Sequence, residues 1–149
     1  MAYLLDTNVL GRLANTMDVQ HGVASQAVLE LHRRGEVLHV TSQVLIEFRN
    51  VATRPIALNG MGLAIVDAEA QAAGFEAAFQ LLAETPDIYP AWKGLVGTLG
   101  IIGKQVHDAR LVAVCHVHAI KYLLTFNVSD FVRMAGFGPG VAIVAPATL

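Results

Sequence analysis

The sequence has one cysteine, little charge and no long apolar run, and each scarcity excludes a class of protein. Cys115 has no partner for a disulfide and no paired base, so we expect a small core residue in a reducing cytoplasm. No stretch reaches the roughly 18–20 consecutive apolar residues that a membrane helix needs. Residues 1–6 lack a basic segment and a cleavable apolar segment, so we expect no signal peptide and a cytoplasmic location.

Basic residues are not in excess either. The 10 lysines and arginines are outnumbered by 12 aspartates and glutamates, so the chain lacks the basic footprint common in nucleic-acid-binding proteins. A polyanionic substrate is still compatible, because a bound metal can supply positive charge locally. The length of 149 residues predicts one domain, residues 1–149. Hydrophobic residues make up 54% of it, which indicates a shared surface, either a homodimer interface or a partner groove.

Short apolar runs alternate with segments of helical period. The runs predict strands over residues 2–5, 37–41, 121–126 and 141–144. Helices are predicted from about Thr7, over 22–34, from Ser42 to before Pro55, over 67–84 and over about 106–120. Residues 90–103 are apolar but contain four glycines, and their structure is left open. Strands alternating with helices imply right-handed crossovers, so we expect an α/β fold with a mostly parallel sheet covered on both faces.

Four of the 12 acidic residues lie beside apolar runs, close to where the chain leaves a strand or enters a helix: Asp6, Glu47, Asp108 and Asp130. Carboxylates avoid such surroundings unless something compensates their charge. A divalent cation is the simplest compensation, because carboxylate oxygens are its preferred ligands.

Each acid also has a plainer interpretation. Asp6 fits an N-cap of the next helix, Glu47 fits a core-margin residue with its head in water, and Asp130 fits a turn or an N-cap. Asp108 fits its alternative, capping its own helix, least well. Apolar residues three, four, seven and eleven positions later place it on the centre line of an apolar face. An unpaired buried carboxylate there would cost several kcal/mol.

Chain direction brings the four acids together. Asp6 ends the first strand, Glu47 lies in the first part of the helix after the second strand, and Asp130 follows the third. The helix bearing Asp108 precedes the third strand and runs antiparallel to it, so its N-terminus lies at the same carboxyl edge, where ligands bind in such sheets. Four carboxylates on one rim repel one another unless neutralised, and oxygen ligands with few histidines favour Mg²⁺ or Mn²⁺.

Other polar residues carry weaker signals. Four basic residues are candidates for phosphate contact, although surface cations commonly serve solubility alone: Arg12, Arg49, Lys104 and Arg110. Residues 98–105 resemble a phosphate-binding P-loop only in part, since they lack its first glycine and the Ser/Thr after the lysine, so we reject that motif. His116 and His118 are two positions apart and would point to different faces of a helix.

The order of four segments resembles the PIN-domain family, and more narrowly the VapC-type toxins of prokaryotic toxin–antitoxin pairs. The segments are Leu-Leu-Asp6-Thr-Asn-Val-Leu, Val-Leu-Ile-Glu47-Phe, Val-His-Asp108-Ala-Arg-Leu and Leu-Leu-Thr125-Phe-Asn127-Val-Ser-Asp130-Phe. The resemblance spans nearly the whole chain. It implies a three-layer PIN-like domain with a mostly parallel, four- to five-stranded sheet flanked by helices. It also implies a Mg²⁺-dependent endoribonuclease that cleaves RNA with metal-activated water, is commonly homodimeric, and is inhibited by a cognate VapB-like antitoxin.

The resemblance also implies the site residues. Four positions match the family's acidic catalytic and metal-binding site: Asp6, Glu47, Asp108 and Asp130. The fourth acid varies in position within the family's Thr-x-Asn/Asp-x-x-Asp-Phe segment, and here Asn127 holds the earlier place, which leaves open whether Asn127 or Asp130 takes that role. Three residues would orient ligands or water from behind the acids: Asn8, Thr125 and Asn127.

Two other classes of function fit part of the pattern. One is a catalytically inactive PIN-like module that only binds a partner, although a scaffold has no reason to retain buried like charges. The other is a different metal-dependent phosphoesterase. Phosphatases of the haloacid-dehalogenase type carry Asp-x-Asp after the first strand, and Asn8 occupies the second place here.

Overall fold

The computed structural model describes all of residues 1–149 and contains one five-stranded sheet. Every strand pairs in parallel with its neighbours, in the order β3-β2-β1-β4-β5. The strands are β1 (Ala2–Leu5), β2 (Val37–Val40), β3 (Gln80–Leu81), β4 (Tyr122–Leu124) and β5 (Ala142–Val144). Leu5 lies opposite Leu124 in the central pair. The chain therefore leaves β1 and β4 at the same level of the sheet.

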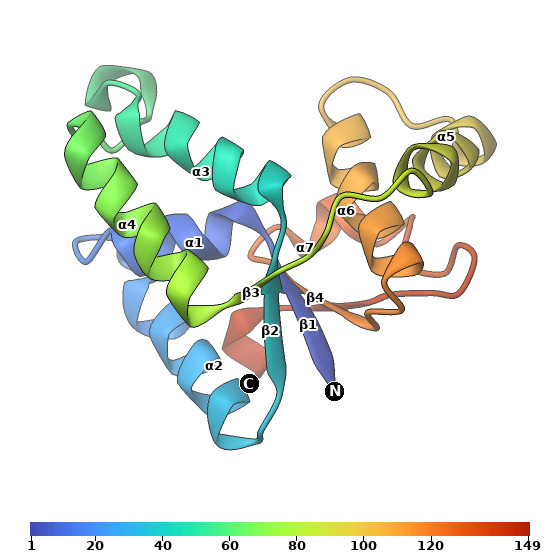
Figure 1. The fold of residues 1–149 in the computed structure, drawn as a ribbon, viewed down its shortest axis with the longest axis horizontal. Helices are drawn as coiled ribbons and strands as arrows, with labels where there is room; N and C mark the ends of the chain where they lie inside the picture. The colour runs from blue at the N-terminus through green and yellow to red at the C-terminus, as the bar shows by residue number, and fades with distance from the viewer.

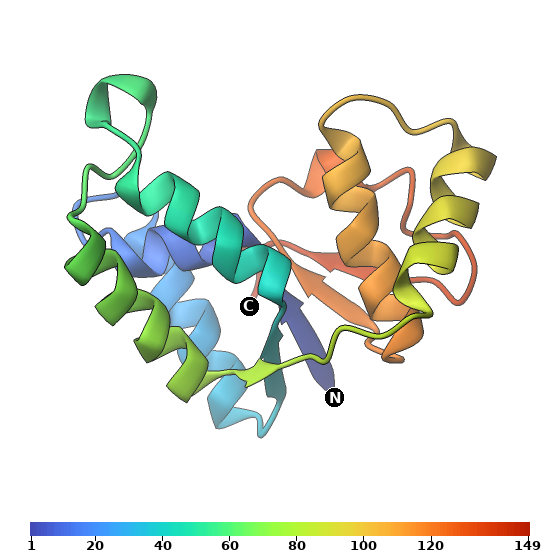
Figure 2. The ribbon, with the colours of Figure 1, turned by 45° about the horizontal axis from the view of Figure 1, so that its top comes forward.

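The helices cover the two faces of the sheet in two groups, as Figure 1 and Figure 2 show: α1 to α4 lie on one side and α5 to α7 on the other. They are α1 (Thr7–Ala14), α2 (His21–Arg33), α3 (Ser42–Thr53), α4 (Ile65–Ala78), α5 (Ile88–Leu99), α6 (Gln105–Val117) and α7 (Val128–Phe131), with 3-10 helices η1 (Ile56–Leu58) and η2 (Pro146–Thr148). The chain moves outward from β1 to β3 and then returns to β4 and β5. Right-handed crossovers therefore place the first helices on one face and the later ones on the other. The predicted three-layer α/β fold is confirmed.

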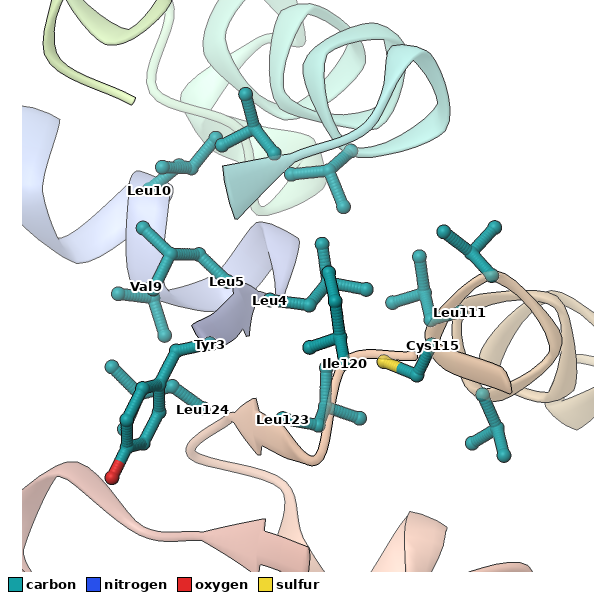
Figure 3. Packing of buried hydrophobic residues seen from close by; sticks show 14 of the residues in the cluster. Tyr3, Leu4, Leu5, Val9, Leu10, Leu111, Cys115, Ile120, Leu123 and Leu124 are labelled. Carbon is teal, nitrogen blue, oxygen red and sulfur yellow. The ribbon is translucent and has the colours of Figure 1, made fainter. Parts of the chain in front are cut away.

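The central strand is buried on both faces. Figure 3 shows Leu5 on the side of α1, near Val9, and Leu4 on the opposite side, toward Cys115 of α6. All four side chains are fully buried within one cluster of 30 core residues. Burial of each leucine stabilises the fold by roughly 1.5–3 kcal/mol. The end of β1 is therefore held in the core, which fixes the position of the residues that follow it. Burial also raises the pKa of the Cys115 thiol to about 12, as fits the predicted core residue.

The predicted helix over 67–84 is wrong at its C-terminal end. Helix α4 ends at Ala78, and residues 80–81 form the edge strand β3 instead. Phe75 and Phe79 keep the helical spacing and are both buried, but the Phe79 backbone is already extended. Strand β3 exists because it pairs with β2, and the Leu82 amide extends this ladder by donating to the Val40 carbonyl at 2.9 Å. Such pairing is a tertiary contact that local periodicity does not report.

Smaller differences concern element ends. The segment 90–103, left open by the sequence, contains most of α5, which ends at Gly100 in the left-handed conformation. Helix α6 stops before the predicted residue 120, because Ala119 has a positive φ of 55°. Strand β4 is shorter than the predicted 121–126. None of the helices combines the length and the apolarity that crossing a membrane requires.

Candidate active site

The acidic residues gather at the carboxyl edge of β1 and β4, the point where the strand order reverses. In open α/β sheets this reversal leaves a crevice beyond the strand ends, where ligands bind. The backbone continues the pairing by one step, since the Asp6 amide donates to the Leu124 carbonyl at 3.0 Å. Asp6 after β1 and Thr125 after β4 are therefore neighbours.

Asp6 is buried and held by three donors. Its Oδ1 accepts from the Thr7 amide at 2.7 Å, and its Oδ2 accepts from the Asn8 amide group at 2.8 Å and from the Thr125 hydroxyl at 2.7 Å. Its side chain is thus the N-cap of α1, so the plainer interpretation also holds. Burial nevertheless raises the pKa of the Asp6 carboxyl, and the hydrogen bonds oppose that shift only in part.

The predicted supporting residues Asn8 and Thr125 form a small network behind Asp6. The Asn8 amide group also donates to the Thr125 hydroxyl at 3.1 Å, and its Oδ1 accepts from the Phe126 amide at 3.0 Å. The Asn127 amide donates to the same Thr125 hydroxyl at 3.0 Å. These bonds join the start of α1 to the segment after β4 and fix the orientation of Asp6.

Glu47 lies one turn into α3, and both of its oxygens have partners. The Thr7 hydroxyl donates to Oε2 at 2.7 Å, and the Gln43 amide group donates to Oε1 at 3.0 Å. The same amide group donates to the His107 carbonyl at 3.0 Å, which ties α3 to the start of α6. Thr7 and Gln43 were not predicted from the sequence. Two features of the sequence could have indicated them: Thr7 directly follows Asp6, and Gln43 lies one helical turn before Glu47.

Asp108 stands in the first turn of α6 and is half-buried, and the N-cap position is occupied by Lys104 instead. Its alternative as a cap of its own helix is therefore not observed. Burial, then the negative charges of Asp6, Asp130 and Glu47, raise the pKa of the Asp108 carboxyl from 3.8 to about 7. All three other acids lie close enough to act on Asp108, so the fold brings the predicted set into one electrostatic neighbourhood.

Asp130 is the only one of the four acids that does not line the cavity. It lies in the short helix α7, half-buried, where a loop or turn was expected. It acts on Asp108 through its charge but does not line the cavity beside the other three acids. Asn127 does line that cavity. The structure thus divides the fourth position between an amide at the cavity wall and a carboxylate outside the cavity lining.

The cavity has a volume of about 420 Å³ and a mostly polar wall. Asp6, Glu47 and Asp108 line it together with residues of α1. Asn15 and Asp18, which follow α1, and residues 59–61 also contribute to the wall. Only one basic residue, Arg12, lines it. The other predicted phosphate contacts lie elsewhere: Arg49 pairs with Glu69, Arg110 pairs with Glu84, and Lys104 is exposed.

The four carboxylates do not form a ready coordination shell. No three His, Cys, Asp or Glu side chains lie close enough together to hold a metal ion, and the Asp6 and Glu47 oxygens are engaged by protein donors. Their chemistry still suits a hard divalent cation, because every donor is a carboxylate oxygen and the acids raise one another's pKa. The donor set fits Mg²⁺ or Mn²⁺, while the side-chain positions would have to adjust to bind it.

Comparisons with solved structures find the same fold in VapBC proteins. VapBC2 from Rickettsia felis, bound to a DNA fragment of its promoter, has a TM-score of 0.72 at 17% identity, covering 97% of this chain and 98% of the other. VapBC-1 from nontypeable Haemophilus influenzae has a TM-score of 0.69 at 16% identity, covering 98% of each chain. VapC20 from Mycobacterium tuberculosis, a toxin that cleaves the sarcin–ricin loop, has a TM-score of 0.66 at 23% identity, covering 91% and 96%.

The sequence itself was compared in two ways. A search of curated proteins found no match. The family model of the PIN domain matches residues 3–136, a span that runs from β1 through α7 and includes all four acids. The chain therefore belongs to the PIN domain family.

Proposed function

We propose that this protein is a metal-dependent endoribonuclease of the VapC type, acting in the cytoplasm. The observation that carries the proposal is the convergence of Asp6, Glu47, Asp108 and Asp130 at one sheet edge, where burial and the charges of the other three acids raise the pKa of Asp108 to about 7. Membership of the PIN domain family and the likeness to VapC20 support RNA as the substrate.

In this proposal Asp6 and Asp108 are the central ligands of Mg²⁺ or Mn²⁺, and Glu47 and Asp130 complete the acidic set. The bound cation would lower the pKa of a water molecule and stabilise the negative charge that develops on the phosphodiester. Thr125 and Asn8 hold the Asp6 carboxylate in one orientation. Thr7 and Gln43 do the same for Glu47, so that it can position the attacking water.

The proposal includes a cognate antitoxin and a second copy of the chain as partners. The structural neighbours from Rickettsia felis and Haemophilus influenzae are VapBC proteins. Large apolar side chains are also exposed along α3, η1 and the start of α4: Ile46, Ile56, Leu58, Ile65 and Val66. Several exposed large apolar side chains on consecutive elements support a protein–protein interface there.

The direct test is RNA cleavage by the Asp6→Asn and Asp108→Asn variants with Mg²⁺ or Mn²⁺, and with EDTA. We expect both substitutions and EDTA to lower the rate by more than the roughly 10–100-fold typical of residues that only orient ligands. The matched control is Asp87→Asn, because Asp87 is exposed and makes no side-chain cap hydrogen bond. Undiminished cleavage by the folded Asp6 and Asp108 variants would refute the proposal.

Two further assays separate the alternatives. Calorimetric titration with Mn²⁺ should show binding that Asp108→Asn weakens, whereas an inactive binding module should show no carboxylate-dependent binding. Incubation with p-nitrophenyl phosphate should release no phosphate. Release without RNA cleavage would instead identify a phosphatase.

A further inference from the structure

Arg12 is the only lysine or arginine that lines the acidic cavity. It lies on α1, one turn after Asn8, and three contacts hold its guanidinium group. Nε donates to the Gln20 side-chain oxygen at 2.6 Å and Nη1 donates to the Asn8 carbonyl at 3.2 Å. The guanidinium carbon lies 4.5 Å from the centre of the Phe126 ring, in a cation–π contact. Its position is therefore well determined.

The partners of Arg12 are all neutral, which distinguishes it from the other candidate arginines. Arg49 and Arg110 each form a salt bridge with a glutamate. Arg12 forms no salt bridge, and its Nη2 has no hydrogen-bond partner in the protein. Asp18 lines the same cavity but forms no salt bridge with Arg12, so no carboxylate of the protein occupies the guanidinium group. A guanidinium group with free N–H donors suits a phosphate.

Arg12 is also tied to the acidic cluster. Asn8, whose carbonyl accepts from Arg12, donates through its side chain to Asp6 at 2.8 Å. Phe126, which stacks on Arg12, follows Thr125, and the Thr125 hydroxyl donates to Asp6 at 2.7 Å. The positive group and the acids are thus held in a defined relation by the same residues. An anion bound at Arg12 would have a defined position relative to Asp6.

We propose that Arg12 binds a backbone phosphate of the RNA in the cavity and thereby positions the neighbouring phosphodiester at the acidic cluster. This inference rests on the proposed function and assigns Arg12 a positioning role. RNA entering the cavity meets repulsion from the four carboxylates that line it (Asp6, Asp18, Glu47 and Asp108), and the one fixed cation on the wall supplies the opposing attraction.

The test measures RNA binding against salt concentration in the Asp108→Asn background, so that RNA binds without being cut. The probe is a short fluorescein-labelled oligouridylate, followed by fluorescence anisotropy in Mg²⁺ buffer. We expect Arg12→Gln to weaken binding roughly 10-fold. The slope of log affinity against log salt should fall by about 0.7, the value for one lost phosphate contact on a single strand. Arg12→Lys should restore the slope, because it restores the charge.

Arg49→Gln is the matched control, since it removes the same charge from a side chain outside the cavity. It should leave the salt slope unchanged. In the Asp108-containing enzyme, Arg12→Gln should raise KM for RNA while changing kcat by less than about 3-fold. An unchanged salt slope in Arg12→Gln, or no binding of the oligouridylate by the chain that retains Arg12, would overturn the inference. Arginine-dependent binding without cleavage by the wild type would refute the nuclease proposal and leave Arg12 as an RNA contact.

Discussion

Replacing Asp108 by asparagine should stabilise the folded protein in the absence of divalent metal, although under the proposed function it should also abolish RNA cleavage. The pKa of this carboxyl is about 7 in the folded protein and 3.8 without the fold. Between these values the unfolded chain binds fewer protons than the folded one, so stability falls as pH rises. The penalty is absent below pH 3.8 and complete above about pH 7. Asparagine cannot ionise, so the Asp108→Asn variant should not lose this stability as pH rises.

The size of the effect follows from the shift in pKa. At 1.36 kcal/mol per pKa unit, the difference between 3.8 and about 7 sets an upper bound of about 4 kcal/mol. Asp108 is only half-buried, so solvent screens its repulsion from the other acids, and we reduce this to about 2 kcal/mol. For a chain of this length, that corresponds to a rise in Tm of roughly 4–8 °C.

The assay is urea and thermal unfolding of both proteins in EDTA, at about pH 5 and about pH 8.5. The gain from Asp108→Asn should be largest at the higher pH and should shrink as the wild-type carboxyl becomes protonated. Asp87→Asn, at an exposed acid, should show no such dependence. A variant no more stable than the wild type at high pH, or a gain independent of pH, would refute the assigned environment of Asp108.

The remaining predictions concern Thr7 and Gly60, which line the cavity, with Gly97 outside it as a comparison. Thr7→Val removes the hydroxyl that donates to Glu47 at 2.7 Å, and we expect kcat for RNA cleavage to fall roughly 10–100-fold with little change in KM, measured by steady-state kinetics. Gly60→Ala should destabilise the protein by at least about 1–3 kcal/mol in urea unfolding, because its Cβ would lie 1.9 Å from the Arg54 carbonyl oxygen. Gly97 lies in helix α5, and a Cβ added there would meet no other atom within 4 Å. Gly97→Ala should therefore stabilise the protein by roughly 0.5–1 kcal/mol. Equal effects of the two glycine substitutions, or unchanged kinetics in Thr7→Val, would contradict these assignments.

Local patterns predicted most of the fold because most of its elements have local causes. The starts of α1 and α3 follow from Asp6 and Thr41, whose side chains cap these helices. Strand β3 has no such cause, since two residues form a strand only when β2 lies alongside. Phe79 led to the wrong prediction that the helix continues to residue 84, because it keeps the helical spacing of α4 although its backbone is already extended.

The four acids were predicted from the sequence, and the family resemblance also implied Asn8 and Thr125, which bond to Asp6. The partners of Glu47, Thr7 and Gln43, were not predicted. A carboxylate beside an apolar run is conspicuous in the sequence, as for Asp108 in α6. The bond between Thr7 and Glu47 joins residues 40 positions apart, and the bond between Gln43 and the His107 carbonyl joins residues 64 positions apart. Threonine and glutamine are common surface residues, and only the approach of α1, α3 and α6 gives these two a role.

The sequence by itself determined that the acids share one rim of the sheet. The alternation of strands and helices imposes parallel strands, and parallel strands end at the same edge. Tertiary structure decided the rest, because charge interaction and burial depend on distances that chain order does not specify. It placed β1 beside β4, so that Thr125 could hold Asp6. It also surrounded Asp108 with three other acids, and it left the charge of Arg12 uncompensated at the cavity wall.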